Sequence, residues 1–374
     1  MPQIQQKSLC LLLAALLVML IFPLPTAGSA TENRAAYTDY RNIPGVTEEE
    51  IAAIEAIKAK YDKLSYGMLD TTETFLREDG SIGGYSALFA GWMTDLFGIT
   101  FDPAIYDWSD LITGFESGTI DFTGELTATP ERRMKYHMTG TFTERTIVAF
   151  RLPGGEAFAD IAKVRPLRYA FLDGSTTGSD VASVSPYDIV PIYVATEDEA
   201  TRLIYAGEVD AFLGEEHSAA AFPENFSKEN IYPVVYSPIS FSTARNELAP
   251  IISVLDKYLQ NGAFYQLIEL YNEGSREYLK YKLYSRLTSA EQAFLDTHQK
   301  GGEPVWIVAE HDNYPTCFYN MREDEWQGIA IDVLSQIHML TGLEFEVANG
   351  PTETWADIFP RLESGEVSMV TELI

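Results

Sequence analysis

The chain has 374 residues, of which 46% are hydrophobic and 12% aromatic. This length leaves room for two ordinary domains with substantial cores, and the composition is not that of a disordered segment. The 55 acidic residues outnumber the 26 basic ones and give a formal net charge of −29. A surface this acidic repels phosphate groups, which argues against binding to nucleic acid or to an anionic membrane surface.

The first 30 residues have the features of a signal peptide rather than of a folded domain. Lys7 supplies a positive start, and residues 9–22 form an apolar run that is shorter than the ~20 residues of a membrane-spanning helix. Gly28 and Ala30 then suit the −3 and −1 positions of a cleavage site. The alternative is an uncleaved membrane anchor. Cleavage would leave Cys317 as the only thiol, so the exported fold would lack disulfides and a cysteine metal site.

The next segments predict alternating helices and strands. Residues 47–60 form an expected helix, because Thr47 and Glu50 make a capping box ahead of isoleucines spaced three apart. A strand over residues 64–69 is followed by a helix over residues 85–97 that Gly98 ends. Further strand and helix signals fall at residues 99–101, 108–115 and 120–122. This alternation predicts α/β layers around a largely parallel sheet.

Comparison of the chain with itself shows that one segment occurs twice. Residues 108–126 recur at an offset of 247 as residues 355–373, and residues upstream align at an offset of 244, so one loop differs by three residues. The identical pairs are Trp108/Trp355, Asp110/Asp357, Glu116/Glu363, Ser117/Ser364, Gly118/Gly365, Glu125/Glu372, Leu126/Leu373, Gly84/Gly328, Gly98/Gly342 and Phe101/Phe345. The sequence therefore predicts two copies of one domain type, of which the second stops early.

The expected organisation follows from these patterns. It comprises a signal peptide (1–30), a lead-in helix (31–63), a first domain (64–285), a linker (286–303) and an incomplete second domain (304–374). The linker is expected to contain a short helix that starts at Thr288 or Ser289, runs to Thr297 and ends before Gly301 and Gly302. Because the second copy lacks the counterpart of everything after Thr127, we expect about 150 further residues to complete it, followed by a membrane span and an output domain.

Several motifs in order resemble those of the bacterial extracellular solute-binding proteins of family 3. They are Gly84-Tyr85, Trp108-x-x-Leu111, Glu116-Ser117-Gly118-x-Ile120-Asp121, Thr127-x-Thr129-Pro130-Glu131-Arg132, Gly174-Ser175-Thr176-Thr177 and Gly207-Glu208-Val209-Asp210-Ala211. The resemblance implies an α/β, two-lobed periplasmic-binding-protein type II fold, followed by a partial first lobe of a second copy. Lobe I would comprise about 64–148 and 234–285 and lobe II about 149–233, with hinge crossings near residues 147–151 and 231–236. The lobes would close on a small polar ligand, most commonly an amino acid in this family.

Arg132 is the leading candidate for binding a ligand carboxylate. Thr129 suits a helix N-cap and Pro130 the first helical position, so Arg132 would add a bidentate fork to the positive end of a helix. The alternative is an arginine paired with Glu131 or Glu144. By its position in the family motif, Thr127 would donate a hydroxyl to the same carboxylate. Thr176, after an expected strand over residues 169–172, would be the contribution of lobe II or else an ordinary polar turn.

Three further residues complete the expected site. Trp108 matches the aromatic wall of the family pocket, and its alternative is a core tryptophan at a helix start. Glu215 matches an acid that takes the ligand's ammonium group, and its alternative is a solvated loop. Glu125 departs from the small or hydroxyl residue common in the family, so it would either repel a carboxylate or select a cationic group. Glu73 lies in a second departure, Thr72-Glu73-Thr74-Phe75, which appears where many members show an aromatic residue followed by Ala-Pro-Phe.

No sequence pattern indicates catalysis, a metal or a cofactor. The five histidines (His137, His217, His298, His311 and His338) show no metal-ligand spacing, and no nucleophile elbow or phosphate-binding glycine loop occurs. We therefore expect a non-enzymatic binding protein outside the cytoplasmic membrane, tethered to it only through a later span. The leading hypothesis is the sensor region of a membrane signalling protein, with a small-molecule ligand and a dimer partner. The alternatives are an ABC importer's binding component with its permease, and a periplasmic enzyme on the same fold.

Overall fold

The computed structural model describes residues 37–372, so the predicted signal peptide lies outside the described residues. Within this part of the chain, no helix is both long enough and apolar enough to cross a membrane. The expected capping box is confirmed: Thr47 accepts a hydrogen bond from the Glu50 amide, and Glu50 bonds back to Thr47, at the start of α2 (Glu48–Lys60). Helix α2 packs on α9 (Ala249–Gln260), where Lys257 Nζ donates to Glu50 Oε1 at 2.7 Å.

Lobe I is built on a sheet whose first three strands are parallel. The strand order β4-β1-β5-β12 places β1 between β4 and β5, and β12 is antiparallel to β5. The short β6 pairs with β12, and β2 and β3 form a separate hairpin. The strands are β1 (Lys63–Met68), β2 (Phe75–Leu76), β3 (Ile82–Gly83), β4 (Thr100–Ile105), β5 (Phe122–Thr127), β6 (His137–Met138) and β12 (Tyr236–Thr243).

The helices of lobe I connect these strands in the manner expected of a parallel sheet. Helix α3 spans Tyr85–Phe97 as predicted, and Gly98 ends it in the left-handed conformation at φ 63°. Helix α4 (Trp108–Ser117) starts at Trp108 and ends in the same way at Gly118. Their apolar faces bury Phe89, Phe97 and Phe115 against the sheet, which is the main reason why short helices of this composition are stable.

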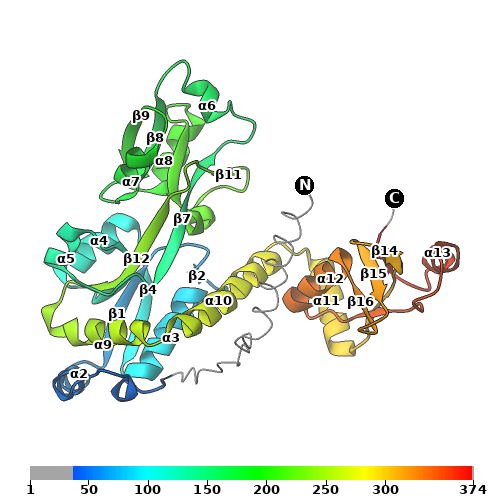
Figure 1. The fold of residues 1–374 in the computed structure, drawn as a ribbon, viewed down its shortest axis with the longest axis horizontal. Helices are drawn as coiled ribbons and strands as arrows, with labels where there is room; N and C mark the ends of the chain where they lie inside the picture. The colour runs from blue at the N-terminus through cyan, green and yellow to red at the C-terminus, as the bar shows by residue number, and fades with distance from the viewer. Residues whose placement is uncertain (1–36, 373–374) are drawn as a thin grey trace, which may run out of the picture. The chain divides into compact units, whose positions relative to one another are not determined.

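Two strands run between the lobes (Figure 1). Strand β7 (Thr143–Arg151) pairs with β12 through Thr146 and with β10 (Ala211–Glu215) from Ile147, so it begins in the first sheet and ends in the second. The chain returns through β12, whose first residue, Tyr236, pairs with Thr146. A two-strand connection of this kind allows the lobes to rotate while each keeps its own core.

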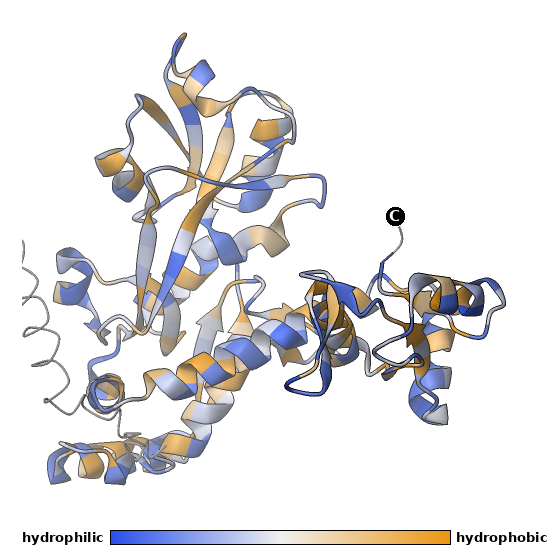
Figure 2. Cartoon of the chain, turned by 45° about the vertical axis from the view of Figure 1, so that its right-hand side comes forward, coloured by the Kyte–Doolittle hydropathy of each residue, from blue (hydrophilic) through white to orange (hydrophobic). Residues whose placement is uncertain are grey.

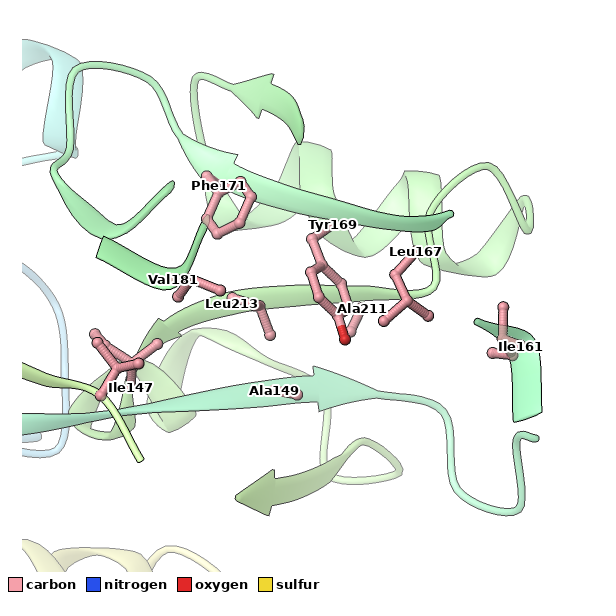
Figure 3. Close-up of a cluster of buried hydrophobic side chains, with 10 residues drawn as sticks. Ile147, Ala149, Ile161, Leu167, Tyr169, Phe171, Val181, Ala211 and Leu213 are labelled. Atoms are coloured by element: carbon pink, nitrogen blue, oxygen red, sulfur yellow. The ribbon is translucent and has the colours of Figure 1, made fainter. Parts of the chain in front are cut away.

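Lobe II has its own sheet, with order β7-β10-β8-β9 and the short β11 on the other side of β7. Ile147, Tyr169, Phe171 and Leu213 form a buried cluster on one face of this sheet (Figure 3). The other face buries a second cluster around Phe150. The remaining elements are α6 (Phe158–Ile161), β8 (Leu167–Leu172), α7 (Thr177–Val184), β9 (Ile189–Val194), α8 (Glu197–Tyr205), the 3-10 helix η2 (Glu216–Ala221) and β11 (Ser227–Asn230). The expected α/β architecture with two lobes is thus confirmed.

Two helices lead from lobe I to the last segment, and the first of them packs on α3. Figure 2 shows hydrophobic and hydrophilic residues alternating along α10 (Phe264–Tyr284). Helix α11 spans Ser289–Gly301 and begins with a capping box between Thr288 and Glu291. The expected cap at Thr288 and the expected stop at the Gly301-Gly302 pair are confirmed, but the predicted last residue, Thr297, is wrong. The helix continues four residues further, because it stops only where Gly302 takes up the left-handed conformation at φ 65°.

The last described segment contains a small parallel sheet of its own. Its order β17-β13-β18 corresponds to the order β4-β1-β5 of lobe I. Gly328 and Gly342 flank α12 as Gly84 and Gly98 flank α3, and all four have positive φ. The elements are β13 (Val305–Val308), β14 (Asp312–Asn313), β15 (Cys317–Asn320), β16 (Glu325–Gln327), α12 (Ile329–Thr341), β17 (Phe345–Val347), α13 (Trp355–Glu363) and β18 (Met369–Val370).

Candidate functional site

A cavity of about 40 Å³ lies between the two lobes, at the carboxyl ends of the parallel strands. This is where open α/β sheets place their ligands. The structure brings all six sequence-predicted site residues to its walls: Trp108, Glu125, Thr127, Arg132, Thr176 and Glu215. Residues that the sequence analysis did not single out also line it, among them Leu69, Ser175, His217 and Ser237.

Helix α5 (Pro130–Lys135) positions Arg132 directly after β5. Thr129 caps this helix by accepting a hydrogen bond from the Arg132 amide at 3.1 Å, and Pro130 occupies the first helical turn, as the sequence predicted. Thr127 is the last residue of β5, and its hydroxyl lies 3.0 Å from that of Ser237 on the neighbouring strand. The local sequence therefore fixes both residues on one wall of the cavity.

The guanidinium of Arg132 makes hydrogen bonds to neutral carbonyl oxygens. It donates to the Thr127 carbonyl at 3.1 Å and, across the cleft, to the Gly174 carbonyl at 3.0 Å. Among the described residues no carboxylate forms an ion pair with it, so the expected alternative of a pair with Glu131 or Glu144 is not what the structure shows. Burial lowers the pKa of Arg132, as expected for a cation removed from water without a counter-ion.

Trp108 contributes both to the core and to the cavity wall. It is the first residue of α4, only 8% exposed, and packs with Phe115, Leu126 and Met138. Its indole Nε1–H donates across the cleft to the Asp173 carbonyl at 2.7 Å. The two alternatives drawn from the sequence, core tryptophan and pocket wall, therefore describe different faces of one side chain.

Three carboxylates surround one buried guanidinium beside this cavity. Arg145, in β7, donates to Glu125 at 2.6 Å, to Glu215 at 3.0 Å and to Glu73 at 2.7 Å. Its side chain is 6% exposed, and those of Glu73 and Glu125 are 7% and 4% exposed. A buried charge requires such partners, because desolvation otherwise costs several kcal/mol.

The environment of this cluster explains two of the sequence expectations. Burial raises the pKa of Glu125, but the positive charge of Arg145 outweighs it and holds that pKa below its ordinary value. Glu125 is therefore an ionised, paired group rather than a free repellent charge in the pocket. Glu215 ends β10 and its side chain is 17% exposed, so the alternative of a solvated loop is wrong for it.

His217 completes the cluster from lobe II. Its side chain is 4% exposed, Nε2 lies 3.8 Å from Glu125 and Nδ1 lies 3.6 Å from Glu215. Its carbonyl accepts a hydrogen bond from the Thr72 amide of lobe I at 2.9 Å. Sequence reasoning missed both His217 and Arg145. The partners of Arg145 are 20, 70 and 72 positions away, and Glu125 is 92 positions from His217, so only the tertiary fold brings these residues together.

Thr176 lies at the N-cap of α7, where its side chain makes no capping hydrogen bond and the residue lines the cavity. A cavity of about 40 Å³ holds only a few water molecules, since one water needs about 10–15 Å³ by the same measure. In this conformation the lobes therefore contact each other directly, through Trp108, Arg132 and Thr72.

Comparison with known proteins gives a family match over most of the first two lobes. The family model of the bacterial extracellular solute-binding proteins, family 3, matches residues 65–274, which is more than half of the chain. None of the curated protein sequences matches the chain significantly.

Solved structures similar to this chain include two binding proteins and a periplasmic domain. An arginine transport periplasmic binding protein from Legionella pneumophila is 15% identical, with 57% of this chain and 100% of that chain covered and a TM-score of 0.49. The ancestral amino acid-binding protein AncCDT-1 is 16% identical, with 58% and 98% covered and a TM-score of 0.45. The periplasmic domain of BvgS from B. pertussis is 16% identical, with 86% of this chain and 63% of that chain covered and a TM-score of 0.41. On the family match, the chain is a member of the bacterial extracellular solute-binding proteins, family 3.

Proposed function

We propose that residues 64–285 bind a small, zwitterionic, amino-acid-like solute between the two lobes, outside the cytoplasmic membrane. The observation that carries this proposal is the polarity of one cavity. Arg132, which has no carboxylate partner among residues 37–372, lines it together with Glu125 and Glu215 of the acidic cluster.

The two charged groups suit the two ends of an amino acid. A ligand carboxylate at Arg132 would replace the two carbonyl contacts with a charge-assisted, bidentate pair, which is the stronger interaction. Thr127 lies on the same wall and would donate its hydroxyl. The ammonium group would face Glu215 and Glu125, where three carboxylates meet only one guanidinium.

Binding also requires the lobes to move apart. An amino acid does not fit a cavity of about 40 Å³, so the solute would enter an open form and the lobes would close on it. Thr176 on α7 and Trp108 on α4 would then contact the solute from opposite lobes.

For the biological role, we propose the input region of a membrane signalling protein, tethered to the membrane outside the described residues and working with a dimer partner. The support is the second segment, in which β17-β13-β18 has the strand order of lobe I and residues repeat in register. A second copy of the module has no evident use in a stand-alone importer subunit, which needs one module to deliver its solute.

Calorimetry with Arg132 variants tests the binding proposal. A thermal-shift screen of the chain against amino acids, polyamines and short peptides first identifies the solute, which should stabilise the fold by about 2.7 kcal/mol at a hundredfold excess over its dissociation constant. Arg132→Ala should abolish binding, and Arg132→Lys should weaken it strongly because a point charge cannot replace the planar fork. Arg133→Lys is the matched control, because Arg133 bonds the Met138 and Thr139 carbonyls away from the cavity. Unchanged affinity in Arg132→Ala would refute the assignment.

A further inference from the structure

We propose that Glu125, Glu215 and His217 form a binding site for a divalent transition-metal ion of the zinc type. These three residues come from β5, from the end of β10 and from the first turn of η2. The proposal shares Glu125 and Glu215 with the proposed ammonium site, but it rests on the cluster's own charge and geometry and not on the identity of the solute.

The cluster contains more negative than positive charge, so a further cation would stabilise it. Three carboxylates, Glu73, Glu125 and Glu215, face the single guanidinium of Arg145, so two negative charges remain uncompensated when His217 is neutral. Uncompensated charge in a buried site is strongly unfavourable. Protonation of His217 would supply only one positive charge, whereas a divalent ion balances the whole cluster.

The geometry is close to that of a metal site. One ligand atom from each of Glu125, Glu215 and His217 can be chosen so that all three lie within 4.8 Å of one another. Zinc bonds to nitrogen and carboxylate oxygen are about 2.0–2.2 Å long, so two ligands of a tetrahedral ion lie about 3.4 Å apart. Shifts of up to about 1.5 Å between these side chains would therefore bring the three atoms into coordination.

The imidazole of His217 is a second observation, separate from the charge balance, that points to a bound metal ion. It is buried to 4% exposure, yet neither ring nitrogen makes a hydrogen bond within the described part of the chain. Nδ1 lies 3.6 Å from a Glu215 oxygen and Nε2 lies 3.8 Å from a Glu125 oxygen, so the ring faces the acidic cluster without a hydrogen bond to it. Buried imidazole nitrogens normally have partners, and a metal ion would supply one.

The ligand set indicates which ion binds. One imidazole with two carboxylates suits zinc and its neighbours among the transition metals, whereas Mg²⁺ and Ca²⁺ prefer oxygen ligands alone. A second cavity, of about 590 Å³, reaches His217, Glu73 and Arg145 and gives an ion a path from solvent. Since the ion and a solute's ammonium group would face the same carboxylates, we expect them to compete.

Titration calorimetry with ZnCl₂ tests the proposal on the tag-free chain after dialysis against EDTA. We expect one zinc ion per chain, with MgCl₂ giving no heat of binding. His217→Gln and Glu215→Gln should each weaken binding at least tenfold. Glu216→Gln and His298→Gln are the matched controls, because Glu216 pairs with Lys228 and the His298 ring packs against that of Phe294, both outside the cluster. Circular dichroism in EDTA establishes that each variant is folded.

Each outcome decides the matter. Absence of zinc binding by the wild-type chain overturns the proposal without reference to any variant. Equal zinc binding by the wild type and a folded His217→Gln also overturns it, because the ion would then occupy adventitious surface carboxylates. If zinc does not bind while an amino acid binds through Arg132 in EDTA, this inference fails and the proposed function stands.

Discussion

Trp108 of lobe I donates its indole Nε1–H to the carbonyl of Asp173 in lobe II, at 2.7 Å. The hydrogen bond joins a residue at the start of α4 to the loop after β8, so it can exist only while the lobes are in contact. The side chain is otherwise packed in the core of lobe I. Trp108 therefore belongs to the core of lobe I and also holds lobe I against lobe II.

Trp108→Phe should weaken this contact without unfolding lobe I, because the phenyl ring keeps most of the packing. Loss of one neutral hydrogen bond costs about 1 kcal/mol, which raises the population of the open form about fivefold. Hydrogen exchange of the Thr72 amide measures this opening, because that amide donates to the His217 carbonyl across the lobes. Its hydrogen exchange should accelerate about fivefold, whereas Trp355→Phe, the repeat-related substitution, should leave it unchanged. Equal exchange rates in Trp108→Phe and the wild type would contradict this link.

Local signals allowed most of lobe I to be predicted from the sequence. Helix α3 has the predicted ends. Gly98 ends it in the left-handed conformation, and this kind of helix end depends only on the local sequence. The strand predicted at residues 120–122 instead spans Phe122–Thr127. Its six residues include the polar Thr123 and Glu125, which are buried by tertiary contacts that no local pattern reveals.

One part of the candidate site could be predicted from the sequence, and the other could not. Arg132 and Thr127 belong to one continuous motif, so the sequence places them together. The cluster around Arg145 draws on residues from four separate segments. In the sequence, Glu73 is visible only as a departure from the family pattern, and His217 only as one histidine among five.

Gly84→Ala should destabilise the first module strongly. Gly84 caps α3 with φ 94°, and a Cβ there would lie 2.5 Å from the Glu73 carbonyl oxygen, so the backbone that carries Glu73 to Arg145 would have to move. We expect a loss of about 3 kcal/mol or more in the free energy of unfolding by urea.

Gly80→Ala separates the clash from the backbone strain. Gly80 has φ 80°, but a Cβ there meets nothing within 4 Å, so the strain alone should cost about 1 kcal/mol. Equal losses in the two variants would show that the close approach of Gly84 to Glu73 does not matter.

Asp210→Asn should reduce stability at neutral pH and change its dependence on acid. Asp210 is 6% exposed and accepts hydrogen bonds from Arg165 at 2.6 and 2.7 Å and from Arg168 at 2.8 and 2.9 Å. Burial raises its pKa, but these hydrogen bonds outweigh burial and hold that pKa well below the ordinary value. We expect the substitution to cost about 2 kcal/mol at pH 7.

The sign of the pH effect follows from this lowered pKa. The contribution of the carboxylate is complete above its unfolded pKa of about 3.9, and it is lost as the pH falls through the lower folded pKa. Urea unfolding between pH 7 and pH 3 should therefore show the difference between wild type and Asp210→Asn shrinking below about pH 4. The exposed neighbour Glu208 provides the control, and Glu208→Gln should not reproduce this pattern. A constant difference across the range would refute it.

The last prediction concerns the exposed apolar surface of the repeated segment. In lobe I, Tyr85 and Phe89 are 4% and 1% exposed, because α10 packs on α3 and Gly274 comes into close contact with Tyr85. The repeat-related residues Ile329 and Val333 are 57% and 51% exposed. They border a cavity of about 300 Å³ whose walls also include Ile307 and Met369.

Apolar surface of this kind promotes association unless another part of a protein covers it. We therefore expect residues 304–374 expressed alone to aggregate, while residues 37–285 form a soluble monomer that unfolds cooperatively. Val333→Lys should make the short fragment more soluble at no cost to its structure, whereas Phe89→Lys should unfold the first module, because it buries a charge among aromatic rings. Light scattering and urea unfolding of the four proteins measure both effects. A short fragment that is monomeric and cooperatively folded without the lysine would show that its apolar face needs no cover.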